Sequence, residues 1–174
     1  MRRRYPAIPA ELVAQLRVIE PSKGGVGDAR CDYYPCRVEL SDGKRLDYVI
    51  VAEARSWLVL WGQQPKPHVS IDDVRRIEES PFRLPAALAT KLYAAGESGM
   101  GYCVFRVVLR DGRQLPFVTG NVVDFPALPT GVTWPDVVDV LPHEGLDRFR
   151  DRGPHADESG APYRWCLFDR LLSA

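Results

Sequence analysis

The chain has 174 residues, of which 45% are apolar and 26% charged, as is typical of a globular protein with one domain or two small ones. Lysine and arginine together number 23, as do aspartate and glutamate, and the only basic cluster is Arg2-Arg3-Arg4. The broad positive surface used for nucleic acid is missing, which argues against a nucleic-acid partner.

In chain order, the first part of the sequence predicts one helix followed by short strands. Residues 8–16 (IPAELVAQL) have the apolar spacing of a helix, and the small residues at 22–27 (SKGGVG) predict a loop. An Asp-Gly turn within 36–51 (CRVELSDGKRLDYVIV) predicts a hairpin. A further strand is expected at 56–62 (SWLVLWG), and an acidic turn opens the last strand at 70–79 (SIDDVRRIEE).

The same series of elements recurs further along the chain. Its members are 84–92 (LPAALATKL), 97–101 (ESGMG), 104–120 (VFRVVLRDGRQLPFVTG), 122–128 (VVDFPAL) and 133–144 (TWPDVVDVLPHE). Several features repeated in one order indicate an internal duplication. We therefore predict a first unit at 5–79, a second at 81–146, and a C-terminal extension at 147–174 that packs on the units.

The two Asp-Gly turns also predict the register of the strands. A three-residue loop that ends in Gly43 or Gly112, with the glycine at positive φ, places apolar residues opposite one another. A two-residue loop instead opposes apolar and charged side chains. The expected cross-strand pairs are Val38 with Leu46, Cys36 with Tyr48, Val107 with Leu115, Phe105 with Phe117 and Cys103 with Thr119.

Together these elements predict an α+β fold that is mainly antiparallel β. Each duplicated unit is expected to be a short N-terminal helix followed by a small SH3-like barrel or a strongly bent sheet. Residues 163–172 (YRWCLFDRLL) are expected to pack across a unit as a strand or short helix.

The glycine-rich stretch 96–101 (GESGMG) invites comparison with phosphate-binding and nucleophile-bearing loops. In those loops a strand precedes the glycines and a helix follows, whereas here a predicted helix precedes and a strand follows. Position 100 is methionine, so the G-x-S-x-G pattern is also missing. We interpret the stretch as a turn in which Gly96 ends the helix, and Ser98 is not predicted to be a nucleophile.

Metal and cofactor chemistry has little support in the sequence. The candidate zinc ligands are Cys31, Cys36, Cys103, Cys166, His143 and His155. They lack the close C-x2-C pairs typical of structural zinc sites, so no metal and no cofactor is predicted. Acidic residues at turns, such as Asp72-Asp73, are interpreted as caps and solvated turn residues.

The leading functional hypothesis is a non-enzymatic protein-interaction or adaptor protein. Tryptophans on or beside a polar loop are typical of recognition surfaces, and 62–70 (GQQPKPHVS) is such a loop. The predicted binding residues are Trp57, Trp61, His68 and Trp134. The expected partner is another protein or a second copy of this chain.

A small cysteine- or metal-dependent hydrolase is the alternative. Cysteine hydrolases place a thiolate beside a histidine that a carboxylate orients. The candidate set within one predicted unit is Cys103 with His143 and Asp136 or Asp139. Whether the three side chains meet in space decides between the two hypotheses.

The sequence also predicts a cytoplasmic protein. No apolar run approaches the ~20 residues of a membrane helix, and the arginine tip is followed by YPAIP rather than by a hydrophobic signal segment. Four irregularly spaced cysteines do not make a disulfide framework. Arginine outnumbers lysine 19 to 4, which favours a GC-rich bacterial genome.

Overall fold

The computed structural model describes residues 5–26, 28–63, 65–147 and 159–170. The chain divides into two compact units: unit 1 is Met1–Phe82 with Pro162–Ala174, and unit 2 is Arg83–Ala161. The described residues contain three α-helices and mostly antiparallel sheets. The predicted α+β, mainly antiparallel class is therefore confirmed.

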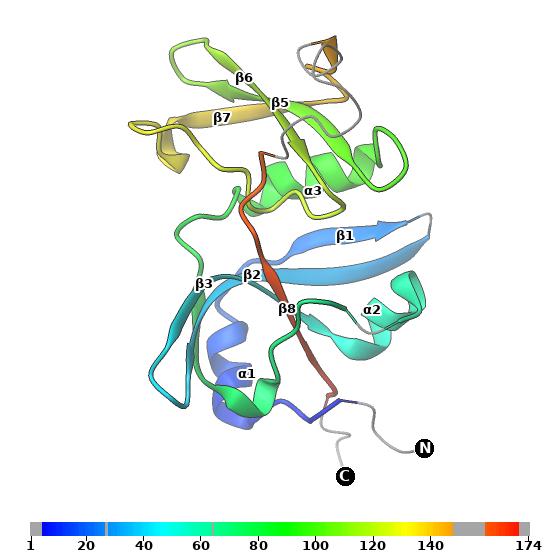
Figure 1. The fold of residues 1–174 in the computed structure, drawn as a ribbon, viewed down its shortest axis with the longest axis vertical. Coiled ribbons are helices and arrows are strands. Elements are labelled where there is room, and N and C mark those ends of the chain that lie inside the picture. The colour runs from blue at the N-terminus through cyan, green and yellow to red at the C-terminus, as the bar shows by residue number, and fades with distance from the viewer. Residues whose placement is uncertain (1–4, 27, 64, 148–158, 171–174) are drawn as a thin grey trace. The chain divides into compact units, whose positions relative to one another are not determined.

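Unit 1 is built on a five-stranded sheet (Figure 1). The strand order is β1-β2-β3-β8, and β4 pairs with the C-terminal part of β2. Every pair is antiparallel except β3 with β8. The elements are α1 (Ala10–Leu16), β1 (Ser22–Val26), β2 (Ala29–Leu40), β3 (Arg45–Glu53), α2 (Ala54–Trp61), the 3-10 turn η1 (Ile71–Asp73), β4 (Val74–Glu79) and β8 (Arg164–Phe168).

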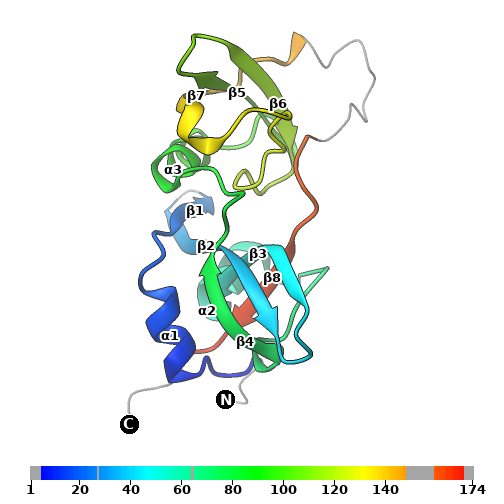
Figure 2. The ribbon, with the colours of Figure 1, turned by 90° about the vertical axis from the view of Figure 1, so that its left-hand side faces the viewer.

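Helix α1 covers one face of this sheet. Leu12 and Leu16 lie four residues apart, so they share a helix face, and both are buried in a core that includes Val38 and Ile77. The side-chain oxygen of Gln15 accepts a hydrogen bond from the Ile77 amide at 2.7 Å, which ties the helix to β4. Figure 2 shows α1 next to β4 and β8 beside β3.

Unit 2 has a three-stranded sheet in the order β6-β5-β7. One face of the sheet packs against the helix α3, where Leu84, Ala89 and Leu92 meet Phe105 and Val107 in a buried apolar cluster. The elements are α3 (Ala86–Ala95), β5 (Cys103–Leu109), β6 (Gln114–Thr119), the 3-10 turn η2 (Trp134–Asp136) and β7 (Val137–Pro142).

Each unit contains a hairpin with a three-residue turn, as predicted. Gly43 has φ of 83° and Gly112 has φ of 85°, the left-handed conformation that glycine adopts without strain. Four of the five predicted cross-strand pairs are confirmed: Val38 with Leu46, Val107 with Leu115, Phe105 with Phe117 and Cys103 with Thr119.

The fifth predicted pair is wrong. Cys36 pairs with Val49, not with Tyr48, because the register of β2 and β3 shifts between Cys36 and Val38. A bulge inserts one extra residue on one strand, so the alternation read back from the turn no longer holds beyond it.

Two predicted strands are not strands. Residues 56–61 lie in α2, and Gly62 follows as its C-cap with φ of 70°. A run of five apolar residues has no period that separates helix from strand, and Trp57 is buried in the helical arrangement. Residues 122–128 are irregular apart from one bridge, between Pro126 and Gly160. The Val123 amide donates to the Tyr93 hydroxyl and the Asp124 carbonyl accepts from the Leu84 amide, so these backbone groups are paired outside any sheet.

Within the described ranges neither sheet closes into a barrel. In unit 2 the edge strands β6 and β7 each pair only with β5, and three strands are too few to curl round and meet. In unit 1 the order ends at β1 and β8, which do not pair with each other.

The contact between Gly24 and Tyr33 yields a stability prediction. A Cβ at Gly24 would lie 2.1 Å from the Tyr33 ring, which is 1% exposed and packs edge-on to Trp165. Gly24→Ala should therefore lower the free energy of unfolding by about 1–3 kcal/mol through overpacking. Urea denaturation followed by tryptophan fluorescence measures it. Lys23→Ala, on the same strand but exposed, should change it by less than about 1 kcal/mol, and equal losses in both variants would contradict the account.

Candidate functional site

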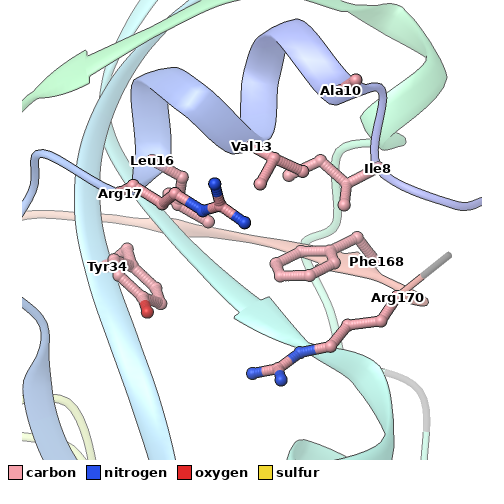
Figure 3. A pocket seen from close by; sticks show the side chains of 8 residues that line it. All are labelled: Ile8, Ala10, Val13, Leu16, Arg17, Tyr34, Phe168 and Arg170. Carbon is pink, nitrogen blue, oxygen red and sulfur yellow. The ribbon is translucent and has the colours of Figure 1, made fainter. Parts of the chain in front are cut away.

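A groove of about 550 Å³ opens in unit 1 between α1 and the end of β8 (Figure 3). Its volume lies within the range of small-ligand sites, roughly 300–1,000 Å³. The residues that line it, here called the α1–β8 groove, are Ile8, Ala10, Val13, Leu16, Arg17, Tyr34, Phe168 and Arg170.

Residues from both ends of the sequence build this groove. The amide of Ile8 donates to the Asp169 carbonyl at 3.1 Å, and the Asp169 amide donates to the Pro6 carbonyl at 2.9 Å. These bonds hold the segment before α1 against the end of β8. The helix then begins after Pro9, whose fixed φ suits a helix start.

The floor of the groove is apolar. Val13 and Leu16 lie three residues apart on α1, so they project from neighbouring positions on one side of the helix. Ile8, Leu16 and Phe168 are 3–6% exposed, so they combine a core role with a small surface toward the groove. The floor therefore suits an apolar side chain.

The rim carries positive charge. Arg17 follows Leu16 at the end of α1, and its guanidinium has no acidic partner among the described residues. The Nε of Arg170 lies 3.4 Å from Glu53 Oε1, with 73% of the Arg170 side chain exposed. No lining residue is acidic. The rim therefore favours an anionic group.

Tyr34 adds a neutral hydrogen-bond donor to the groove. Burial is the largest cause that raises the pKa of its phenol, and the charge of Asp32 raises it further. The hydroxyl therefore keeps its proton at neutral pH. Together, an apolar floor, two guanidinium groups and a phenol suit a carboxylate that is attached to an apolar group.

Three of the four predicted binding residues, Trp57, Trp61 and His68, belong to unit 1. Trp57 is 4% exposed and packs against Trp165, with ring centroids 5.4 Å apart, and against Trp61 at 6.4 Å. Trp61 is half-buried and its Nε1 donates to the Tyr33 hydroxyl at 3.1 Å. These tryptophans therefore also serve as packing residues of the α2 side of unit 1.

His68 and Trp134 lie in different units. His68 is half-buried, its Nε2 accepts a weak hydrogen bond from the Leu167 amide at 3.5 Å, and burial lowers its pKa, so it stays neutral at pH 7. Trp134 begins η2 and packs against the apolar cluster of unit 2. None of the four residues lines the α1–β8 groove, which the sequence analysis did not find.

The structure does not assemble the candidate triad. Cys103 begins β5 and is buried, whereas Asp136 lies beyond the other end of that strand, where its backbone carbonyl accepts from Arg110. The Asp136 carboxylate accepts from the amide and hydroxyl of Thr133, which lowers its pKa. Six residues of strand, about 20 Å, separate the Cys103 and Leu109 ends of β5.

All four cysteines are free and buried. Burial raises the pKa of Cys103 to about 11 and the pKa values of Cys31 and Cys166 to about 12. A buried thiol with a raised pKa is a poor nucleophile. Within the described ranges no three His, Cys, Asp or Glu residues are placed to hold a metal ion, and His155 lies outside those ranges.

His143 instead contacts Ser98, a pair that the sequence analysis did not predict. The Ser98 Oγ lies 2.9 Å from His143 Nδ1, and His143 Nε2 lies 3.0 Å from the Ala95 carbonyl. His143 is also the one non-glycine residue of the described ranges with positive φ, at 61°. No local sequence pattern predicts the contact between Ser98 and His143, because the two residues are 45 positions apart in the sequence.

Comparison with known protein families, curated proteins and solved structures finds no match for this chain. Its geometry therefore carries the functional argument. Among the described residues, no helix combines the length and apolar character needed to cross a bilayer.

The raised cysteine pKa values predict slow thiol chemistry. At pH 8 a thiol of pKa 11 is only about 0.1% thiolate, and burial adds a steric barrier to reagents. Native protein mixed with an excess of 5,5′-dithiobis(2-nitrobenzoate) should therefore react over hours, whereas all four thiols should react within minutes in guanidinium chloride. Rapid modification of Cys103 in the native protein would contradict this assignment.

Proposed function

We propose that the chain is a protein-interaction or adaptor protein that arose by internal duplication, and that unit 1 recognises its partner by non-enzymatic binding of a partner segment in the α1–β8 groove. The groove is the observation that carries the proposal, because it combines an apolar floor with two arginines at its rim, of which only Arg170 has an acidic partner among the described residues. The segment it fits has a large apolar side chain next to an aspartate or glutamate.

The shared construction of the units supports the proposed duplication. Each has a helix that follows a proline, a central strand with antiparallel neighbours on both sides, and a 3-10 turn before the last of them. Gly43 donates to the Leu40 carbonyl and Gly112 to the Leu109 carbonyl, both at 2.9 Å. The register with the last strand shifts next to Leu40 and next to Leu109.

The position of the groove also explains why only unit 1 would bind the partner segment. Ile8 precedes α1, Phe168 ends β8 and Arg170 follows it. Among its described residues, unit 2 has no strand in its sheet that corresponds to β8. A partner that binds at the end of β8 is therefore specific for unit 1. Self-association through the same groove is a second form of the same proposal, with the segment supplied by another copy.

Reversing the charge at the rim tests the proposal. A phage-displayed peptide library selected on the native protein should yield peptides with Asp or Glu beside Leu or Phe. Arg17→Glu should weaken binding of a selected peptide at least ~10-fold, because the guanidinium becomes a carboxylate facing another carboxylate. Fluorescence polarisation measures the Kd.

Arg55→Glu is the matched control, since Arg55 is an exposed arginine on α2 that does not line the groove. It should leave the Kd within about twofold of the native value. Peptides that bind Arg17→Glu as tightly as the native protein, or a selection that enriches no acidic-apolar sequence, would overturn the assignment of the groove.

A further inference from the structure

Ser98 and His143 form a hydrogen-bonded pair at the surface of unit 2, supported on both sides. Nε2 of His143 faces the Ala95 carbonyl at 3.0 Å, and a carbonyl can only accept a hydrogen bond. In the neutral ring the proton therefore lies on Nε2, and Nδ1 presents its lone pair to Ser98. The Ser98 hydroxyl thus donates to Nδ1 across 2.9 Å.

A backbone amide holds the serine oxygen from the other side. The Val104 amide donates to Ser98 Oγ at 2.8 Å. A donor at this position stabilises negative charge on the oxygen, so it favours loss of the hydroxyl proton to His143. The Val104 carbonyl lies farther from Oγ, at 3.3 Å, and already accepts from the His143 amide at 2.7 Å.

The backbone of His143 adopts a conformation that is rare for a non-glycine residue. Its φ of 61° lies in the left-handed region, where non-glycine residues are rare, and strain of this kind gathers at functional sites. Three hydrogen bonds hold it there, from the amide and both ring nitrogens. The ring is exposed and Ser98 is half-buried, so a small molecule can reach the pair.

We propose that Ser98 is a nucleophile that His143 activates as a general base, acting on small uncharged carboxylic esters. Serine paired with a fixed histidine is the arrangement that covalent acyl transfer uses. Exposed Met100 and Tyr102 on the same loop offer apolar surface to the acyl group, and exposed Glu97 and Glu144 disfavour an anionic substrate.

The chemical step balances within the pair and the ester. Ser98 Oγ attacks the ester carbon, its proton passes to His143 Nδ1, and the new Oγ–C bond replaces the bond to the alkoxide group. The leaving alkoxide takes the proton from His143 and departs as an alcohol. Water, deprotonated by His143, then attacks the acyl-serine and releases the carboxylic acid, which restores the Ser98 hydroxyl.

Acetylation by p-nitrophenyl acetate tests the proposal on the full chain. Mass spectrometry of peptides from the treated protein should place an acetyl group on Ser98, formed with stoichiometric release of p-nitrophenol. His143→Asn should slow acetylation at Ser98 by at least ~100-fold, the usual contribution of a general base. Asparagine tolerates the left-handed backbone, so this variant keeps the fold while it removes the base.

Ser98→Ala should abolish the adduct at that peptide, and Ser41→Ala, at an exposed turn serine, should leave the rate at Ser98 unchanged. Circular dichroism checks that each variant is folded. If Ser98→Ala does not fold, the acetylation rate of His143→Asn still tests the proposal. Absence of acetyl from Ser98, or an equal rate in His143→Asn, would overturn the proposal. None of these outcomes depends on the α1–β8 groove.

Discussion

In each unit, the packing depends on a buried valine at the centre of three neighbouring antiparallel strands. In unit 1, Val38 lies between Leu46 and Ile77, and in unit 2, Val107 lies between Leu115 and Val140. Both valines are fully buried. A slip of one residue would turn each valine to the other face of its sheet, so burial fixes the register, and the register fixes every loop that leaves these strands.

The two candidate sites lie at corresponding places relative to that register. Tyr34 precedes Cys36 on β2 and reaches the α1–β8 groove, while Val104 lies on β5 and donates to Ser98. Both residues precede the buried valine of their central strand, so each site lies away from the Asp-Gly turn. At the turn end of each sheet, backbone hydrogen bonds join the strands to the 3-10 turn. The Arg110 amide, for example, donates to the Asp136 carbonyl.

The sequence predicted what local pattern determines. Positive φ at Gly43 and Gly112, and the pairing of Val107 with Leu115, follow from turn chemistry and alternation over a few residues. It missed α2 because an apolar run such as 57–61 has no decisive period, so its environment decides the outcome. It missed the groove because the contact between Ile8 and Asp169 joins opposite ends of the chain, and no local pattern records such a contact.

The loop that carries Ser98 lacks the strand-turn-helix order of known nucleophile loops, in the structure as in the sequence. The helix α3 ends at Gly96, and Ser98 reaches its partners through the fold rather than through a motif. Catalytic pairs are defined by geometry, and the same constellation recurs in unrelated chain orders. A motif search therefore tests only one of the ways in which a serine can meet a histidine.

Ser80 follows β4 as His143 follows β7, so the two residues can be compared. The comparison distinguishes a structural role of His143 from a chemical one. The amide of Ser80, after β4, donates to the Pro35 carbonyl, as the amide of His143, after β7, donates to the Val104 carbonyl. Both positions therefore anchor the chain to the central strand, yet Ser80 does so without positive φ. The anchor does not need the strained backbone. What the strain adds at His143 is the placement of an imidazole ring between the end of α3 and Ser98, and that placement is the feature the proposed chemistry uses.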